Sequence, residues 1–68
     1  MNNLKQAIYD KGLTVSQLSY KTQIPATTLH TYISGKRQLK HAKYSTLLKL
    51  AKALNTSVSN LVGDENSD

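Results

Sequence analysis

The sequence of 68 residues has no cysteine, tryptophan or phenylalanine, and only one proline and one methionine. Without cysteine, the chain cannot form a disulfide framework, a thiolate zinc site or a cysteine nucleophile. Hydrophobic residues make up 38% of the chain, and a chain of this length buries only about 60% of the surface that its unfolded form exposes. We therefore expect a single small domain with a modest core and no large enclosed active site.

Long hydrophobic runs are also absent. The longest uninterrupted apolar run is residues 7–9, whereas a transmembrane helix needs about 20 apolar residues and a signal-peptide core about 7–15. The sequence therefore predicts a soluble, cytoplasmic protein with no membrane partner.

Acidic residues are few and unevenly placed. Residues 1–63 carry nine Lys and Arg against Asp10 alone, a net charge of +8, while residues 64–68 carry three acids and no base. We predict one basic folded domain over residues 1–63 and an acidic, disordered tail over residues 64–68. A polyanion such as nucleic acid is the first partner to expect.

Apolar residues that recur at helical spacing predict helices along the chain, and no stretch has the alternation of a β-strand. The first helix follows Asn2 or Asn3, either of which can cap it, and ends at Gly12. A second helix starts at Thr14, because Thr14 and Gln17 have the spacing of a capping box. We therefore expect an all-α fold.

The second and third helices have a short connection. The second covers residues 14–21 and ends before Pro25, whose ring disfavours helical geometry in the preceding residue. The third covers residues 26–33, and Gly35 closes it. About four residues join the two helices, which matches the tight connection of a helix-turn-helix.

The second half of the chain predicts a polar loop and two more helices. Residues 36–41 have no clear period and are expected to form the loop. A fourth helix ends near Asn55, and Ser57 starts a short fifth helix that Gly63 ends. The expected inward stripe of the fourth helix is Tyr44, Leu47, Leu48, Ala51 and Leu54.

Three stretches of the chain have a specific order and spacing. They are Gly12-Leu13-Thr14 leading into Gln17-Leu18-Ser19, then residues 24–35, then residues 47–55. With them, residues 4–61 resemble the XRE family of phage-repressor-like (Cro/CI-type) helix-turn-helix DNA-binding domains. The resemblance implies a compact five-helix, lambda-repressor-like fold. It also implies that helix 26–33 is a recognition helix for the major groove and that helix 14–21 lies across it near the backbone.

The sequence departs from the family pattern at the start of the second helix and near both ends of the third. Ser19 stands where alanine is usual and Gln23 where glycine is usual, so the turn must either hold Gln23 in a left-handed conformation or change shape. Val15 replaces a glutamine that contacts phosphate in many members, so Thr14, Gln17 and the helix amides would serve instead. The connection between the third and fourth helices is longer than usual and rich in basic residues.

By position, the family's base-contacting residues fall on Ala26, Thr27, Thr28 and Thr31. None is arginine, asparagine or glutamine, which make the bidentate base contacts worth ~1–3 kcal/mol each. Hydroxyl groups can pair with several base edges, and methyl groups suit the thymine methyl. We therefore predict modest direct readout weighted toward thymine, with a contribution from DNA shape. The alternative is an exposed polar helix face without a partner.

Basic side chains follow the recognition helix directly: Lys36, Arg37, Lys40 and Lys43. Flexible charged side chains suit phosphate contacts, which fix the register of a protein on DNA without reading sequence. We predict that these four residues contact phosphates together with Thr14, Gln17 and His30. A solvated basic loop is the alternative.

His30 and His41 do not predict a metal or catalytic site. Asp10 is the only acid before the tail, and two histidines without a third ligand rarely make a specific metal site. A nucleophile, a base and an orienting acid cannot be assembled from these residues. We expect no enzyme activity, metal, cofactor or small-molecule substrate.

The resemblance implies a transcriptional regulator, of the repressor type found in phages and prophages, that binds a near-palindromic operator in double-stranded DNA as a homodimer. The alternative is a protein-interaction module of the same fold, antitoxin-like or an anti-regulator, without specific DNA readout. Exposed candidates for a partner surface are Leu39, Val58, Leu61 and Val62. Val58 and Leu61 can equally cap the core of the monomer.

Overall fold

The computed structural model describes residues 2–63, and the predicted acidic tail, residues 64–68, lies outside the described residues. The described part of the chain contains five α-helices, a short 3-10 helix and no β-strand, which confirms the expected all-α architecture. The elements are α1 (Leu4–Asp10), α2 (Val15–Thr22), α3 (Ala26–Ser34), η1 (Leu39–His41), α4 (Tyr44–Ala53) and α5 (Val58–Val62). None of these helices is long and apolar enough to cross a membrane.

The two asparagines before α1 have different roles. Asn3 occupies the N-cap position without a side-chain capping bond, and Asn2 satisfies the first helical amide instead, because its side-chain oxygen accepts a hydrogen bond from the Leu4 amide at 3.0 Å. Asn3 instead donates its side-chain amide to the carbonyl oxygen of Asn60 at 2.8 Å, which ties α1 to α5. The chain leaves α1 through Gly12, whose φ of 66° is left-handed, as the sequence predicts.

The core lies where the helices meet and is almost entirely aliphatic. The largest fully buried side chains are Leu4, Leu18, Leu29, Leu39, Leu50, Leu54 and Leu61. Each of the five α-helices and η1 contributes at least one of these leucines. Full burial of a leucine side chain stabilises a fold by about 1.5–3 kcal/mol, so the short helices are held by this shared core and not by their own propensity.

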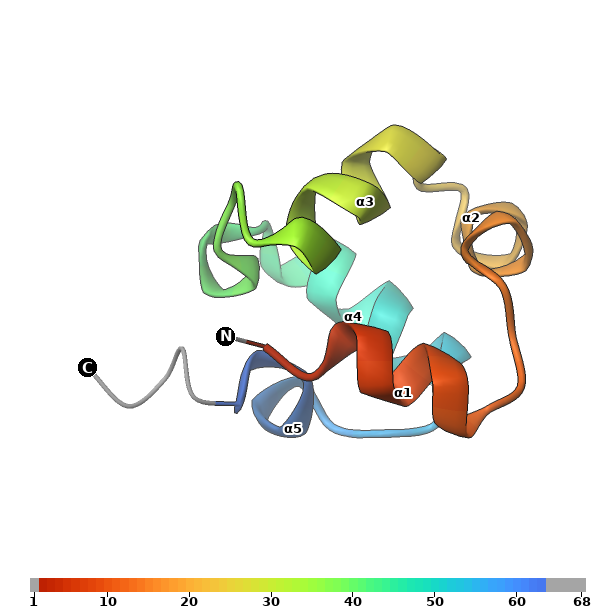
Figure 1. Ribbon diagram of the computed structural model, residues 1–68. Coiled ribbons are helices and arrows are strands. Elements are labelled where there is room, and N and C mark those ends of the chain that lie inside the picture. The colour runs from red at the N-terminus through yellow and green to blue at the C-terminus, as the bar shows by residue number, and fades with distance from the viewer. Residues whose placement is uncertain (1, 64–68) are drawn as a thin grey trace.

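The helix-turn-helix is formed by α2 and α3, as the sequence predicts. In Figure 1, α3 lies at the top of the molecule, α1 and α5 lie at the bottom, and α4 lies between them. The second helix, α2, packs against both α3 and α4, while α1 packs against α3 and α5. This arrangement leaves the outer face of α3 on the surface of the domain, at the edge opposite α5.

The predicted inward stripe of α4 was partly wrong. Tyr44 is 66% exposed and Leu48 is 38% exposed, whereas Leu50, which the prediction left out, is completely buried. The buried residues of this helix and its end are Leu47, Leu50, Ala51 and Leu54. They follow the i, i+3, i+4, i+7 spacing of one helix face, so the helix is rotated relative to the broader stripe that was expected.

The predicted exposed partner surface was also wrong. Leu39, Leu61 and Val62 are buried, and Val58 is half-buried against the core. Residues 39–41 form η1 instead of an irregular loop, and this turn directs Leu39 inward. The alternative for α5 is confirmed, since Val58 and Leu61 cap the core of the monomer.

Candidate nucleic-acid interface

The start of α2 is closed by the capping box that the sequence predicts. The Thr14 hydroxyl oxygen accepts from the Gln17 amide at 3.1 Å, and the Gln17 side-chain oxygen accepts from the Thr14 amide at 2.8 Å. Both side chains are exposed. Their oxygens are occupied, so what they can offer an anion is the Thr14 hydroxyl hydrogen and the Gln17 side-chain NH₂ group.

The turn between α2 and α3 holds Gln23 in the left-handed conformation, with φ 61° and ψ 25°. The sequence left open whether the turn holds Gln23 in a left-handed conformation or changes shape, and the structure has the left-handed conformation. Two hydrogen bonds stabilise the conformation: the Gln23 amide donates to the Ser19 carbonyl at 2.8 Å, and the Gln23 side chain donates to the Tyr20 carbonyl at 3.0 Å. They offset a steric cost on the order of 1–2 kcal/mol for a left-handed residue with a Cβ atom.

Two hydroxyl groups of α2 complete the turn. The Ser19 hydroxyl donates to the carbonyl oxygen of Ile24, which follows the left-handed Gln23 in the turn. Thr22 is buried, and its hydroxyl donates to the Leu18 carbonyl at 2.8 Å while accepting from the Ile24 amide at 3.4 Å. The serine that replaces the usual alanine therefore supplies a bond across the turn that alanine cannot make.

The four predicted base-contacting residues lie in the first two turns of α3. Leu29 and Tyr32 face the core. Thr27 is exposed, and the other three predicted residues, Ala26, Thr28 and Thr31, are half-buried. His30, predicted as a phosphate contact, is exposed on the same helix. The structure thus gathers these residues on one surface of α3, a helix that has no Lys, Arg, Asp or Glu.

The outer face of α3 also carries a row of local hydrogen bonds that the sequence did not indicate. The Thr31 hydroxyl donates to the Thr27 carbonyl at 2.8 Å, and the Ser34 hydroxyl donates to the Thr31 carbonyl at 3.1 Å. Positions 27, 31 and 34 are spaced i, i+4, i+7 and share one side of the helix. Ser34 is therefore part of this surface, although it was not among the predicted contacts.

The basic segment, residues 36–43, is attached to α3 and to the core. The Arg37 amide donates to the Thr31 carbonyl at 3.4 Å, which places the start of the segment beside the recognition helix. Leu39 is completely buried and anchors the middle of the segment. Of the four predicted phosphate contacts in the segment, Lys40 is half-buried, and the other three, Lys36, Arg37 and Lys43, are exposed.

Two anchoring residues of this surface were missed. Leu39 is the only large apolar residue between Gly35 and Lys43, and an isolated apolar residue among charges is the signal that would have predicted an anchor. Asn2 donates its side-chain amide to the Tyr32 carbonyl at 3.1 Å, which fastens the end of α3 to the start of α1. No short-range pattern in the sequence indicates that second contact.

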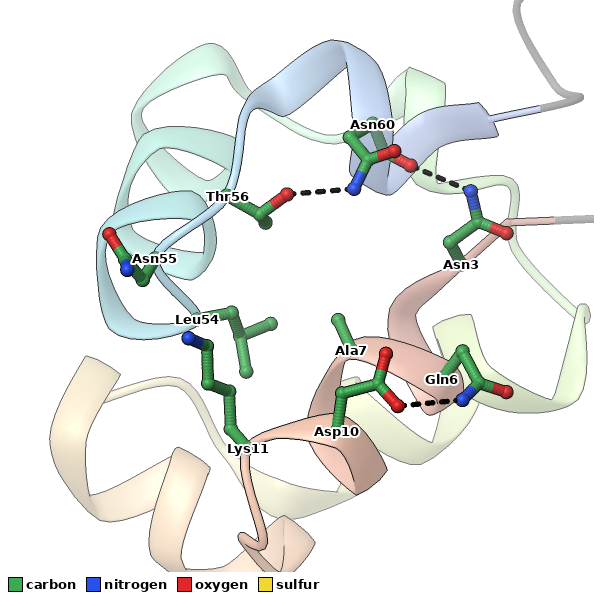
Figure 2. Close-up of a pocket in the computed structure, with 9 residues that line it drawn as sticks. All are labelled: Asn3, Gln6, Ala7, Asp10, Lys11, Leu54, Asn55, Thr56 and Asn60. Carbon is green, nitrogen blue, oxygen red and sulfur yellow. Dashed lines mark hydrogen bonds between the residues drawn. The ribbon is translucent and has the colours of Figure 1, made fainter.

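A polar cleft lies away from this surface, between α1 and the segment that joins α4 to α5 (Figure 2). Four of its polar side chains are bonded in pairs: Gln6 donates to Asp10, and Asn60 donates to Thr56, both at 2.8 Å. Asp10 is its only carboxylate, so it offers no acid–base pair for catalysis. Within residues 2–63, no group of three or more His, Cys, Asp or Glu side chains could hold a metal ion.

Comparison with known protein families gives a match over nearly the whole chain. A family model described as the Cro/C1-type HTH DNA-binding domain matches residues 3–67. No match was found among curated proteins or among solved structures. The matched stretch contains all five α-helices and both sets of predicted contact residues.

Proposed function

This chain belongs to the family of Cro/C1-type helix-turn-helix DNA-binding domains, which are not enzymes, and we propose that it is a sequence-specific transcriptional regulator of the repressor type. In this proposal α3 enters the major groove of double-stranded DNA, and the basic segment contacts the adjacent phosphates. The observation that carries it is the Arg37–Thr31 backbone bond, which holds a charged, exposed segment directly beside an uncharged, hydroxyl-bearing helix face.

The two parts of this surface have separate tasks in the proposal. The helix face has no charged side chain and can discriminate between base edges, whereas the basic segment provides affinity that is independent of sequence. Thr14, Gln17 and His30 add phosphate contacts on either side of the groove. If each subunit neutralises ~4 phosphates, the log-log salt slope of a dimer is about −7.

We place the homodimer contact on α4 in this proposal, because the surface first considered is buried. Tyr44 and Leu48 are the exposed large apolar residues of α4, and they lie one helical turn apart. Together with the half-buried Val58 they line a cleft between α4 and α5. A dimer through this face would bind a near-palindromic operator whose half-sites are about 34 Å apart.

The test is a selection of binding sites from a random duplex pool, followed by comparison of two double variants. Thr27→Ala with Thr31→Ala is expected to change the selected sequence. Lys36→Ala with Arg37→Ala is expected to weaken binding to all sequences alike and to reduce the salt slope by about 2 per protomer. Lys5→Ala with Lys49→Ala is the matched control, since it removes the same charge from exposed positions on α1 and α4 that do not line the cleft proposed for the dimer.

The expected control result is a smaller change in affinity than the Lys36 and Arg37 pair gives. Binding to duplex DNA that is weak and indifferent to both salt and sequence would contradict the proposal. So would a control pair that weakens binding as much as the Lys36 and Arg37 pair does.

A protein-interaction module of the same fold is the second candidate. Val15 is packed against the core and offers no polar group to a phosphate, and the face of α3 has none of the side chains that make bidentate base contacts. A selection that yields no consensus, together with a pulldown that recovers one stoichiometric protein partner, would favour this function over DNA reading.

A further inference from the structure

The hydroxyl groups at positions 31 and 34 of α3 have a fixed hydrogen-bond direction. Each lies within bonding distance of a backbone carbonyl of the same helix, at 2.8 Å for Thr31 and 3.1 Å for Ser34. A carbonyl oxygen has no hydrogen, so the hydroxyl is the donor in each pair. While this bond is kept, each of these oxygens presents only lone pairs to an outside partner.

Thr31 is the better placed of the two to meet a base. Base contacts in helix-turn-helix domains come from the N-terminal residues of the recognition helix. Thr31 is in the second turn of α3, whereas Ser34 is its last residue. The i−4 bond also selects one of the two side-chain rotamers that threonine adopts in helices, so the oxygen is already oriented before a partner arrives.

The edges of the bases in the major groove divide into donors and acceptors. Guanine and thymine present only acceptors there, whereas adenine and cytosine each present one donor, the exocyclic amine at N6 or N4. An oxygen that can only accept pairs with an amine and is repelled by the lone pairs of guanine O6 or thymine O4. We infer that Thr31 reads an exocyclic amine and so selects adenine or cytosine at the base that it faces.

This inference rests on the proposed function, because it needs α3 in the major groove. It goes further by assigning a chemical class of base to one side chain. It also separates Thr31 from Thr27, whose hydroxyl has no hydrogen-bond partner within the described part of the chain and can therefore donate or accept.

The test scans the selected duplex with base analogues that lack the amine. Each adenine of the consensus is replaced in turn by purine, and each cytosine by 2-pyrimidinone. With the wild-type protein, one replacement per half-site is expected to reduce affinity about 3- to 10-fold, the size of one single hydrogen bond to a base. Whether purine or 2-pyrimidinone gives the loss identifies the base as adenine or cytosine.

The variants Thr31→Val and Thr31→Ser assign that loss to the hydroxyl. Thr31→Val keeps the branched shape but removes the oxygen, so it should bind the natural duplex as weakly as the wild type binds the analogue, with no further loss on the analogue. Thr31→Ser keeps the oxygen and should retain the loss. Thr27→Val is the matched control and should leave the effect of the analogue unchanged.

The result that overturns the inference is a clear consensus in which no amine deletion matters, or in which Thr27→Val and not Thr31→Val abolishes the effect. That result leaves the proposed function intact, because a consensus has been obtained. Failure to select any consensus contradicts the proposed function itself, and the inference with it. The analogue scan uses the wild-type protein, so a consensus in which no amine deletion matters overturns the inference even where a variant folds poorly.

Discussion

The two ends of α3 are held by different kinds of interaction. At the N-terminal end, the turn from α2 is held by side-chain hydrogen bonds from Ser19 and Gln23 to nearby carbonyl groups, in addition to the burial of Ile24. At the C-terminal end, the basic segment is held by the complete burial of Leu39 and by one backbone bond from Arg37. Both junctions are places where the sequence departs from the family pattern, yet each has its own means of stabilisation.

The difference matters because the two kinds of interaction have different strengths. A hydrogen bond within the protein that takes the place of a hydrogen bond to water contributes about 0.5–1.5 kcal/mol to the free energy of unfolding. A fully buried leucine side chain contributes about 1.5–3 kcal/mol. The position of the basic segment should therefore depend on a single large apolar residue, while the turn combines the buried Ile24 with several weak contacts. Substitutions at the two junctions can test this comparison.

The largest effect is expected from Leu39→Ala. Removing the side chain leaves a cavity in the core, and such changes cost about 2–5 kcal/mol of the free energy of unfolding. The midpoint of urea unfolding measures this loss. Binding to all DNA sequences should also weaken, because residues 36–43 lose their anchor.

Leu13→Ala is the control for Leu39→Ala, since Leu13 is only half-buried and lies outside the proposed dimer contact. Its truncation should cost clearly less than that of Leu39. If Leu39→Ala is too unstable to study, Leu39→Met keeps nearly the same volume and should lose less than about 1.5 kcal/mol. Equal losses for Leu39→Ala and Leu13→Ala would show that the segment is not anchored by Leu39.

An intermediate effect is expected from Ser19→Ala. The substitution removes the hydrogen bond to the Ile24 carbonyl, a loss of about 1 kcal/mol, and alanine returns up to about 0.5 kcal/mol through its higher helix propensity. The net change in the free energy of unfolding should be a loss of about 0.5–1 kcal/mol, again measured by urea unfolding.

Ser16→Ala provides the matched control, because Ser16 is an exposed serine of the same helix. It gains the same helix propensity without losing a bond across the turn, so it should leave the domain equally stable or slightly more stable. The idea of a side-chain bond across the turn is wrong if Ser19→Ala and Ser16→Ala have the same stability.

Local chemistry explains which parts of the fold could be predicted. The capping box of Thr14 and Gln17 and the left-handed helix ends at Gly12 and Gly35 depend on residues within a few positions of each other, and each is present. The rotation of α4 was mispredicted at Tyr44 because it is set by packing between helices, which periodicity alone does not contain.

The candidate site also has one part that the sequence predicts and another part that it does not. The residues that α3 and the basic segment bring together could be named from their order in the chain. The direction of the Thr31 hydroxyl and the inward path of Leu39 could not, because the first depends on a side-chain rotamer and the second on a 3-10 turn among polar residues. Both depend on the three-dimensional surroundings and not on residue type.

The smallest effect is expected from Gln23→Gly, and its sign is the opposite of the others. Glycine adopts the observed φ of 61° without the steric cost of about 1–2 kcal/mol that a Cβ atom brings. Glycine also makes the unfolded chain more flexible, which lowers the free energy of unfolding by about 0.4–1 kcal/mol. The hydrogen bond from the Gln23 side chain to Tyr20 is lost as well. A net gain of about 0.5 kcal/mol should appear as a higher urea midpoint at unchanged slope.

Gln23→Val, which introduces a β-branched residue, should destabilise the domain, since such residues tolerate positive φ least. A loss of stability in Gln23→Gly would mean that the exposed bond to Tyr20 outweighs the backbone strain, and that even the weakest contact of this turn is stronger than the comparison with Leu39 implies.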